Sequence, residues 1–292
     1  MRRLLAIGDL HLSHKYNKEA FYALEPHEED GLIICGDVGE KAEHLRTAFE
    51  LTTQLFKTVI WVPGNHELYT LPNDESGLRG EMKYQECVSI ANEYGVITPQ
   101  DEFIRYDGEG GPCLICPIFT LYDYSFRPDH VTRENALSWA EEQNVMATDE
   151  ALLHPDPYET RDKWCEELIA STIPRLEAAA AQGIPLVIIN HWPLRQDLIT
   201  IPAVPRFTLW CGTKATHDWH KRFNAKVVVT GHLHVRRTDH IDGVRFEEVS
   251  LGYPNQWQDA RNAGREINTM LREILPGPEY KGDEATIWRQ IG

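Results

Sequence analysis

TVIWVPGNHE, residues 58–67, contains in ten residues the pattern that decides the fold of this chain. Its first five residues are β-branched, aliphatic or aromatic and end at a proline, which is typical of a strand buried on both faces. Gly64 then permits a sharp turn and a close approach of the backbone to a ligand. Asn65, His66 and Glu67 follow directly, and side chains of these types bind metals or transfer protons. The stretch therefore predicts a buried strand that ends in reactive side chains.

The same pattern, an apolar run followed by polar residues, occurs four more times. Each run predicts a short buried strand. The runs and the polar residues after them are Leu4–Gly8 with Asp9 and His11, Gly31–Cys35 with Asp37, Pro185–Ile189 with Asn190 and His191, and Ala225–Val229 with His232 and His234. Ligands in open α/β sheets bind beyond the carboxyl ends of the strands, so we expect these polar side chains to meet at one edge.

Two of these sites repeat polar residues at a spacing of two, D-x-H at 9–11 and H-x-H at 232–234. We expect an extended backbone in both, which would place the first and third side chains on the same side. Gly8, Gly36 and Gly231 flank the sites and allow the turn that follows each strand. Each tripeptide is therefore expected to contribute two ligands to one metal cluster.

The rest of the chain alternates helices with further strands, which predicts an α/β sandwich with helices outside packed sheets. In the longest helix Pro174 should produce a kink or begin a new helix. The expected helices are 40–56, 79–94, 135–147 and 160–182, and a further strand is expected at 245–249.

The chain has no internal repeat and no Gly/Ser linker. This favours a single domain over residues 1–292. We expect its core to span about residues 3–250. The tail, 251–292, is rich in Pro, Gly and charge, and we expect it to wrap the surface.

The composition is strongly acidic, with 29 Lys and Arg against 45 Asp and Glu and a formal net charge of −16. Nucleic acids and anionic lipids need a basic surface, so this charge weighs against both as partners. No apolar run approaches the roughly 20 residues that cross a bilayer. The apolar stretch at the N-terminus ends at Gly8 and is too short for a signal peptide. We therefore expect a cytoplasmic protein that binds neither nucleic acid nor membrane.

The six cysteines are scattered along the chain. Cys113 and Cys116 form a C-x-x-C, but no second pair accompanies them, and they lie in an apolar, strand-like run. Cytoplasmic thiols stay reduced. We expect two buried thiols here rather than a redox or zinc site.

The ordered set D-x-H, G-D, G-N-H-E, H and G-H-x-H resembles the calcineurin-like metallophosphoesterase superfamily. The resemblance implies a four-layer α/β/β/α sandwich, with two packed mixed sheets flanked by helices and two metal ions at the strand ends. It further implies that His66 is the non-ligand histidine beside the phosphate. The implied ligands are Asp9, His11 and His234 for the first metal, Asp37 as the bridge, and Asn65, His191 and His232 for the second.

The chemistry of these residues agrees with the resemblance. All seven ligands offer nitrogen or oxygen, which favours Mn or Fe, or Zn, over softer metals. Two such ions would bind the phosphate oxygens and activate a water molecule. His66 would protonate the leaving oxygen or stabilise charge on phosphorus. Glu67 has two possible roles, to orient His66 or to accept structural hydrogen bonds.

Several longer segments resemble the actinobacterial phosphopantetheinyl hydrolases, which remove 4′-phosphopantetheine from acyl carrier proteins. The resemblance implies an acyl or peptidyl carrier protein as substrate. The alternative is a phosphomonoesterase or phosphodiesterase of nucleotides or other small phosphorylated metabolites. A scaffold without catalysis is disfavoured because Asp37 and His66 are both present. The similar segments are 57–70, 121–126, 158–165, 207–220 and 244–257.

A long, helix-poor stretch, 192–219, follows His191 and has the length of a lid or specificity loop. It carries cations and aromatic residues suited to a phosphate with an organic tail. From this stretch and from the segment after D-x-H, the expected substrate-binding residues are His14, Asn17, Arg195 and Lys214.

An acidic carrier protein and an acidic enzyme repel each other, so docking would need a locally basic edge. The candidate cations lie beside the loop and directly after G-H-L-H. They are Lys214, Lys221, Arg222, Arg236 and Arg237.

Overall fold

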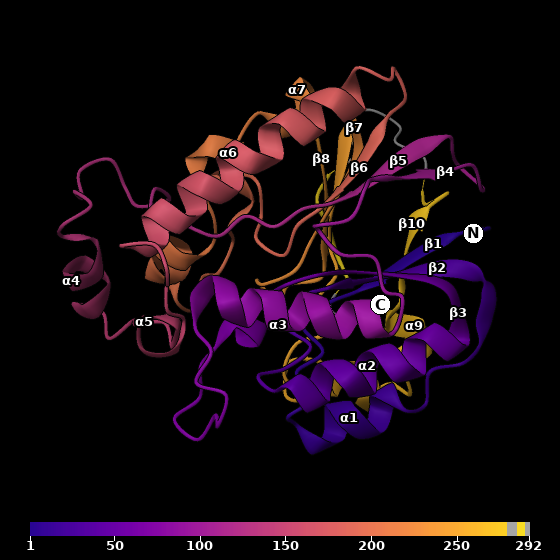
Figure 1. Ribbon diagram of the computed structural model, residues 1–292, viewed down its shortest axis with the longest axis horizontal. Coiled ribbons are helices and arrows are strands. Elements are labelled where there is room, and N and C mark those ends of the chain that lie inside the picture. Colours follow the sequence, from indigo (N-terminus) through magenta and orange to yellow (C-terminus); the bar gives the residue numbers. More distant parts are fainter. Residues whose placement is uncertain (279–284, 290–292) are drawn as a thin grey trace.

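The computed structural model describes residues 1–278 and 285–289 and contains two β-sheets (Figure 1). The first sheet has the order β10 (Arg272–Leu275), β1 (Leu4–Ile7), β2 (His27–Cys35) and β3 (Phe56–Val62). The second has the order β11 (Ile287–Trp288), β8 (Arg237–Ile241), β9 (Val244–Glu248), β7 (Ala225–Thr230), β6 (Leu186–Ile189), β5 (Cys113–Pro117) and β4 (Ile104–Tyr106). Strands β1, β2 and β3 of one sheet and β5, β6, β7 and β9 of the other are parallel, whereas β10, β4 and β8 pair antiparallel with their neighbours, so both sheets are mixed as predicted.

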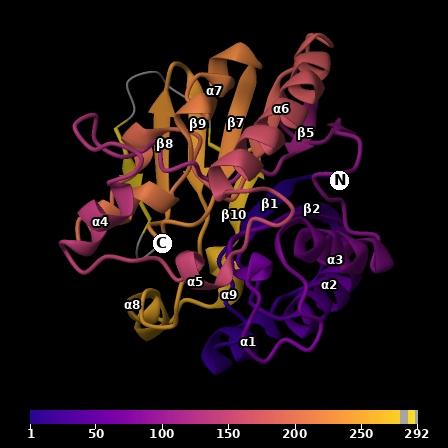
Figure 2. The same cartoon turned by 60° about the vertical axis from the view of Figure 1, so that its left-hand side comes forward.

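Helices cover the outer faces of both sheets. Figures 1 and 2 show α1 to α3 grouped against the first sheet and α6 with α7 on the side of the second. The α-helices are α1 (Lys15–Phe21), α2 (Ala42–Leu55), α3 (Gly80–Glu93), α4 (Ala136–Glu141), α5 (Asp149–Leu152), α6 (Arg161–Ala180), α7 (Trp219–Arg222), α8 (Gln258–Asn262) and α9 (Ile267–Met270). The described residues also form four short 3-10 helices, η1 (His66–Leu68), η2 (Gln196–Leu198), η3 (Pro205–Trp210) and η4 (Lys214–Thr216).

The alternation of side chains along the strands produces the four layers. On β1, Leu4 and Ala6 pack in the core between the two sheets, whereas Leu5 and Ile7 belong to the core beneath α2 and α3. The strands of the second sheet divide in the same way, with Ile188 on the outer side against α6. Successive strand residues point to opposite faces, so an all-apolar strand must be covered on both sides. This is the predicted α/β/β/α sandwich.

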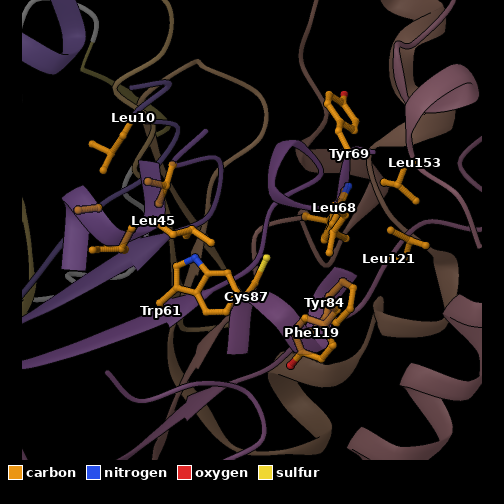
Figure 3. Packing of buried hydrophobic residues seen from close by; sticks show 14 of the residues in the cluster. Leu10, Leu45, Trp61, Leu68, Tyr69, Tyr84, Cys87, Phe119, Leu121 and Leu153 are labelled. Carbon is orange, nitrogen blue, oxygen red and sulfur yellow. The ribbon is translucent and has the colours of Figure 1, made fainter. Parts of the chain in front are cut away.

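The core on the helical side of the first sheet extends toward the loops beyond the strand ends. Figure 3 shows Leu45 of α2 and Trp61 of β3 in the same cluster as Leu68, which lies just beyond the end of β3. All three side chains are almost completely buried. The loop that carries Asn65 and His66 is therefore anchored in the core on its far side.

Pro174 does not begin a new helix, because α6 runs through it from Arg161 to Ala180. Proline removes only its own N–H donor, which leaves the carbonyl of Ala170 without that partner. Both residues are exposed, so water can satisfy this carbonyl. The helix expected over 135–147 is shorter than predicted and spans Ala136–Glu141.

The expectation that the tail only wraps the surface is wrong. Strand β10 pairs with β1 and contributes Ile274 and Leu275, both fully buried, to the core between the sheets. Short strands with charged residues at their start lack a clear alternation, so sequence patterns miss them. Within the tail, residues 279–284 and 290–292 lie outside the described residues.

Cys113 and Cys116 are both buried and unpaired, as expected. Cys113 packs in the core between the sheets and Cys116 in the outer core beside α6. A spacing of three along strand β5 places the two thiols on opposite faces, so they cannot share a metal ion or form a disulfide.

Across the described residues, none of the helices is both long and apolar enough to span a membrane. The cytoplasmic location and the lack of nucleic-acid binding stay predictions.

Candidate metal centre

The predicted ligands converge where the two sheets meet. Asp9, Asp37 and Asn65 come from loops after β1, β2 and β3 of the first sheet, and the histidines at 191, 232 and 234 follow β6 and β7 of the second. The two sheets join here, because Gly8 forms an isolated bridge with Ser250, just beyond β9.

The first group of predicted ligands is Asp9, His11, Asp37 and His234, whose donor atoms all lie within 4.8 Å of one another. The Nε2 atoms of His11 and His234 are 3.2 Å apart, and Nε2 of His234 is 3.0 Å from Oδ1 of Asp9. Oδ2 of Asp37 lies 4.0 Å from Nε2 of His11. Two carboxylates and two imidazoles thus face a common point.

The second group is Asp37, His191 and His232. Nδ1 of His232 lies 3.2 Å from Nε2 of His191 and 3.2 Å from Oδ1 of Asn65. Oδ2 of Asp37 is 3.5 Å from Nε2 of His191. Asp37 alone belongs to both groups, which is the position expected of a bridging carboxylate.

These residues fit a pair of cations. Nδ1 of His191 lies 2.9 Å from the carbonyl oxygen of Cys35 and must donate to it, so the neutral imidazole has the lone pair of Nε2 directed at the cluster. Nδ1 of His234 likewise donates a hydrogen bond to Oε1 of Gln256, and these two atoms are 2.7 Å apart. Burial lowers the pKa of His11 and of His232 well below the usual range, which favours neutral imidazole, the form that binds metal. Lone pairs and carboxylates gathered in a buried site need positive charge among them.

The backbone of the site is not extended, contrary to expectation. Asp9 and His11 have φ values of 50° and 43°, Asp37 has 52°, and His232 and His234 have 72° and 55°. Five of the seven predicted ligands therefore adopt the left-handed conformation, which costs a residue with a side chain roughly 1–2 kcal/mol. Such strain persists where surrounding contacts enforce it and is concentrated at functional sites.

The glycines of the site do more than permit turns. They also allow neighbouring loops to come into close contact. A Cβ atom on Gly64 would collide with Oδ1 of Asp37, and one on Gly231 would collide with Oδ2 of Asp9. Both carboxylates thus lie directly against a neighbouring glycine, so a side chain at either position would displace a ligand.

His66 lies beside the ligands, and Glu40 orients it. Nδ1 of His66 is 2.8 Å from Oε1 of Glu40, while Nε2 is 3.9 Å from Oδ2 of Asp37. Burial lowers the pKa of His66, but the charge of Asp37 and the bond to Glu40 outweigh it and raise this pKa to about 9. Asn65 has helical φ and ψ and caps η1, and its side chain contacts Asp149 whereas that of His66 contacts Glu40.

Glu67 takes the structural role of the two considered. Its carboxylate accepts hydrogen bonds from the backbone N–H groups of Asp37, Val38 and Gly64, at 2.8–3.1 Å. Burial raises the pKa of Glu67 to about 7. The Glu67 side chain thus links the loop after β2 to the loop after β3. None of these three hydrogen bonds involves the imidazole of His66.

The side-chain amide of Asn65 is held by two residues that the sequence did not single out. Its Nδ2 donates to Oδ1 of Asp149 at 3.0 Å and to the hydroxyl oxygen of Tyr69 at 2.9 Å, and Tyr69 itself donates to Asp149 at 2.6 Å. These bonds turn Oδ1 of Asn65 toward His232, the direction in which a metal ligand is needed.

Three further residues of the site come from the segment after β9. Ser250 donates to Oδ2 of Asp9 at 2.7 Å, and the ring of Tyr253 stacks on His11 with centroids 4.3 Å apart. Gln256 accepts from the backbone N–H of Tyr253 at 2.7 Å as well as contacting His234. Two signals in the sequence point to them: the segment follows a predicted strand, and it lies within 244–257, one of the segments that resemble the phosphopantetheinyl hydrolases.

Two of the four expected substrate-binding residues do not face the cluster. Asn17 is completely buried, and its amide bonds to backbone oxygens of Leu10 and Gly252 while accepting from Trp257. Arg195 is also buried and pairs with Asp197 at 2.6 Å. Polar side chains near a ligand in sequence often satisfy the loop backbone instead of the ligand.

The other two are exposed but differ in position. His14 lies at the rim, with its ring 5.4 Å from that of Tyr253, and its contact with substrate stays a prediction. Lys214 pairs with Asp129 at 3.2 Å and lines a separate surface pocket with Gln196 and His217.

The expected basic edge is mostly neutralised. Arg236 is buried and donates to the backbone oxygens of Leu251 and Gln256, and Arg237 is buried against Asp239. Lys221 and Arg222 are exposed, but each pairs with a carboxylate, of Asp242 and Glu177 respectively, at 2.8 and 2.7 Å. Cations near the site therefore serve the fold or compensate acidic neighbours.

A cavity of about 280 Å³ lies over the ligand cluster. Part of its wall is made by ligands and His66, and the rest by side chains of two loops. Its lining residues are Asp37, Asn65, His66, Ile201, Val204, Phe207, His232, Leu233, His234, Tyr253 and Gln256.

Comparisons with known proteins match nearly the whole chain. The family described as Calcineurin-like phosphoesterase matches residues 2–236. A relative from Mycobacterium tuberculosis, acyl-carrier-protein phosphodiesterase PptH, is 45% identical over 279 residues, which is 95% of this chain and 84% of the relative. The crystal structure of phosphopantetheinyl hydrolase (PptH) from that organism aligns with a TM-score of 0.87 and 44% identity, covering 96% of this chain and 98% of the other. The family match spans every predicted ligand.

Proposed function

Because the chain belongs to the calcineurin-like phosphoesterase family, whose members are metal-dependent hydrolases, we propose that it releases 4′-phosphopantetheine from an acyl or peptidyl carrier protein. The observation that carries this proposal is the 45% identity to an acyl-carrier-protein phosphodiesterase over 95% of the chain. The convergence of all seven predicted ligands independently supports metal-dependent hydrolysis of a phosphoester.

The proposed reaction cleaves one phosphodiester bond. A water oxygen forms a new bond to phosphorus, the bond between phosphorus and the serine oxygen breaks, and the serine recovers a proton. The products are 4′-phosphopantetheine and the apo carrier protein. Two metal ions, when bound, would stabilise the negative charge of the phosphoryl group and activate the water.

His66 is suited to supply the proton to the serine oxygen. Glu40 accepts from Nδ1, which leaves Nε2 directed into the cavity beside Asp37. A proton held at Nε2 can pass to a leaving oxygen in this space, and a positioned acid of this kind contributes roughly 10²–10⁴-fold to the rate. Glu40 acts on the reaction through His66 and is a positioning residue.

Family members bind two metal ions, and we propose Mn, Fe or both for this chain, with Zn as the remaining candidate. The ligand set of imidazole, carboxylate and amide oxygen suits these metals. Elemental analysis of protein prepared without chelator should give close to two metal equivalents per chain. A single equivalent in fully active protein would contradict the two-metal assignment.

Intact-mass analysis tests the substrate. Holo carrier protein incubated with the Mn-loaded enzyme should lose the mass of 4′-phosphopantetheine and yield the apo form. The His66→Ala variant, loaded in the same way, serves as the control and should leave the holo form intact over the same period. If small phosphoesters are consumed while holo carrier protein survives prolonged incubation, the enzyme is instead a phosphoesterase of small metabolites.

A further inference from the structure

The cavity over the ligand cluster has one wall that does no metal chemistry. Ile201, Val204 and Phe207 come from the long loop after β6, and Leu233 lies between the ligands His232 and His234. All four are apolar and line the same cavity as Asp37 and His66. We call these four residues the apolar wall.

The apolar wall is held in place by packing from behind. Leu233 belongs to a small buried cluster with Phe126 and Cys211, and Ile201 and Phe207 pack against that cluster. The ring of Phe207 also stacks on the ring of His232, with centroids 5.8 Å apart and an angle of 27°. The wall is therefore fixed relative to a predicted metal ligand, although Val204 itself remains 43% exposed.

No Lys or Arg is among the described residues that line this cavity. A substrate group that carries a second negative charge next to the reacting phosphate would have no cationic side chain to pair with in this cavity. Burying that charge would therefore be unfavourable. The apolar wall instead favours an uncharged, branched group close to the phosphorus.

The pantetheine arm has such a group at the required position. Its phosphate oxygen is bonded to a methylene, and the next carbon carries two methyl groups. We propose that the apolar wall is the subsite for these two methyl groups, and this inference rests on the proposed function.

The geometry of displacement at phosphorus supports this placement. The entering water and the leaving serine oxygen lie at opposite ends of one axis, and the other three substituents lie between them. Two of these are charged oxygens, which belong beside the ligand cluster. The third is the oxygen of the pantetheine arm. Outside the predicted ligands and His66, the cavity is lined by Tyr253, Gln256 and the apolar wall, and of these the apolar wall suits an uncharged, branched group. Burying two methyl groups there would orient the phosphate for attack along the axis.

The test compares two substrates that differ only in the methyl groups. One is holo carrier protein, and the other is the same carrier charged with a pantetheine arm that lacks both methyls. For the wild-type enzyme we expect kcat/KM to fall by roughly 10-fold or more when the methyls are absent, the size of discrimination that apolar pockets achieve. Equal kcat/KM values for the two substrates would overturn the proposal.

A pair of matched double variants locates the discrimination. Ile201→Ala with Val204→Ala shortens the wall, whereas Ile199→Ala with Val235→Ala removes the same atoms from side chains that pack on the cluster without lining the cavity. The first variant should reduce discrimination to less than about threefold, mainly by lowering kcat/KM for natural substrate. The second should retain wild-type discrimination.

Two results would contradict the inference or its premise in distinguishable ways. If the first double variant keeps full discrimination, the methyl groups bind elsewhere and the apolar wall is not their subsite. If the metal-loaded wild-type enzyme cleaves neither carrier conjugate but hydrolyses small phosphoesters, the proposed function is wrong. The inference, which rests on that function, is then wrong as well.

Discussion

Two buried clusters of charged residues in this molecule have opposite compositions. In the ligand cluster, Asp9 and Asp37 lie among imidazoles, and their other hydrogen-bond donors are backbone N–H groups and the hydroxyl of Ser250. In the second, Glu247 is completely buried and forms ion pairs with Arg245 at 3.0 Å, Arg272 at 2.7 Å and Arg289 at 3.1 Å. Each cluster must balance its charge, because isolated charges in the interior are costly.

The difference shows how a site that needs an external cation can be told from one that does not. The carboxylate of Glu247 finds its counter-charges within the chain, and Thr238 donates a further hydrogen bond to it at 2.7 Å. The ligand cluster has two carboxylates and lone pairs, but none of its members carries a permanent positive charge. The cluster around Glu247 therefore stabilises the fold, and the ligand cluster is suited to bind metal ions.

The largest effect is expected for Asp37→Asn, which removes the carboxylate shared by both ligand groups. We expect kcat/KM to fall by roughly 10³–10⁴-fold, because phosphoryl charge would lose several kcal/mol of stabilisation. Elemental analysis should show less than two metal equivalents in the same preparation. Unchanged activity with unchanged metal content would remove Asp37 from the cluster.

His66→Ala separates acid catalysis from metal binding. Turnover should fall by at least about 10²-fold, since the positioned proton donor is lost. Metal content should stay near that of the wild type, because the close hydrogen bond of the side chain goes to Glu40, at 2.8 Å, whereas Nε2 lies 3.9 Å from Oδ2 of Asp37. Loss of one metal equivalent would instead make His66 a ligand.

Asp149→Leu tests the residue that orients Asn65. The substitution removes the acceptor of the Asn65 amide and should weaken metal affinity about 10–100-fold. Asp149→Asn keeps an oxygen acceptor of the same shape and serves as the matched control, with affinity within a few-fold of the wild type. Metal titration monitored by recovery of activity and by calorimetry measures both variants. Equal affinities for Leu and Asn would show that Asp149 does not act through Asn65.

Glu247→Ala should affect stability instead of metal binding. Removing one partner from a buried ion-pair cluster costs about 3–5 kcal/mol of unfolding free energy. Urea unfolding measures this loss, and elemental analysis of the folded variant should still give the wild-type metal content. If Glu247→Ala keeps wild-type stability but loses metal, the roles assigned to the two clusters are wrong.

The smallest effect is expected for charge reversal at Lys221 and Arg222. Both already pair with carboxylates at the surface, and exposed pairs contribute little. KM for the carrier protein should change by less than about threefold at 0.15 M salt, where screening acts over about 8 Å. A tenfold rise in KM for the carrier alone, with small substrates unaffected, would restore the basic edge as the docking surface.

The sequence by itself determined the family, the layered α/β fold and the strands that carry the site. Apolar runs such as 58–62 are expected to be buried on both faces, so each sheet must be covered on both sides, here by helices on one side and the other sheet on the other. The order of polar residues after these runs was enough to bring Asp9, Asp37 and His232 to one edge, because parallel strands end on the same side. Their roles as ligands stay predictions that the experiments above test.

Only the tertiary structure decided what each polar side chain contacts. Glu40 rather than Glu67 reaches His66, and Asn17 bonds to the backbone of its own loops, because these pairings depend on how left-handed turns bring distant loops together. Strand β10 and the ion pairs that neutralise the expected basic edge likewise join segments far apart in the chain. Periodicity records which face of an element is buried, but it holds no information about which neighbour from another element a polar atom will meet.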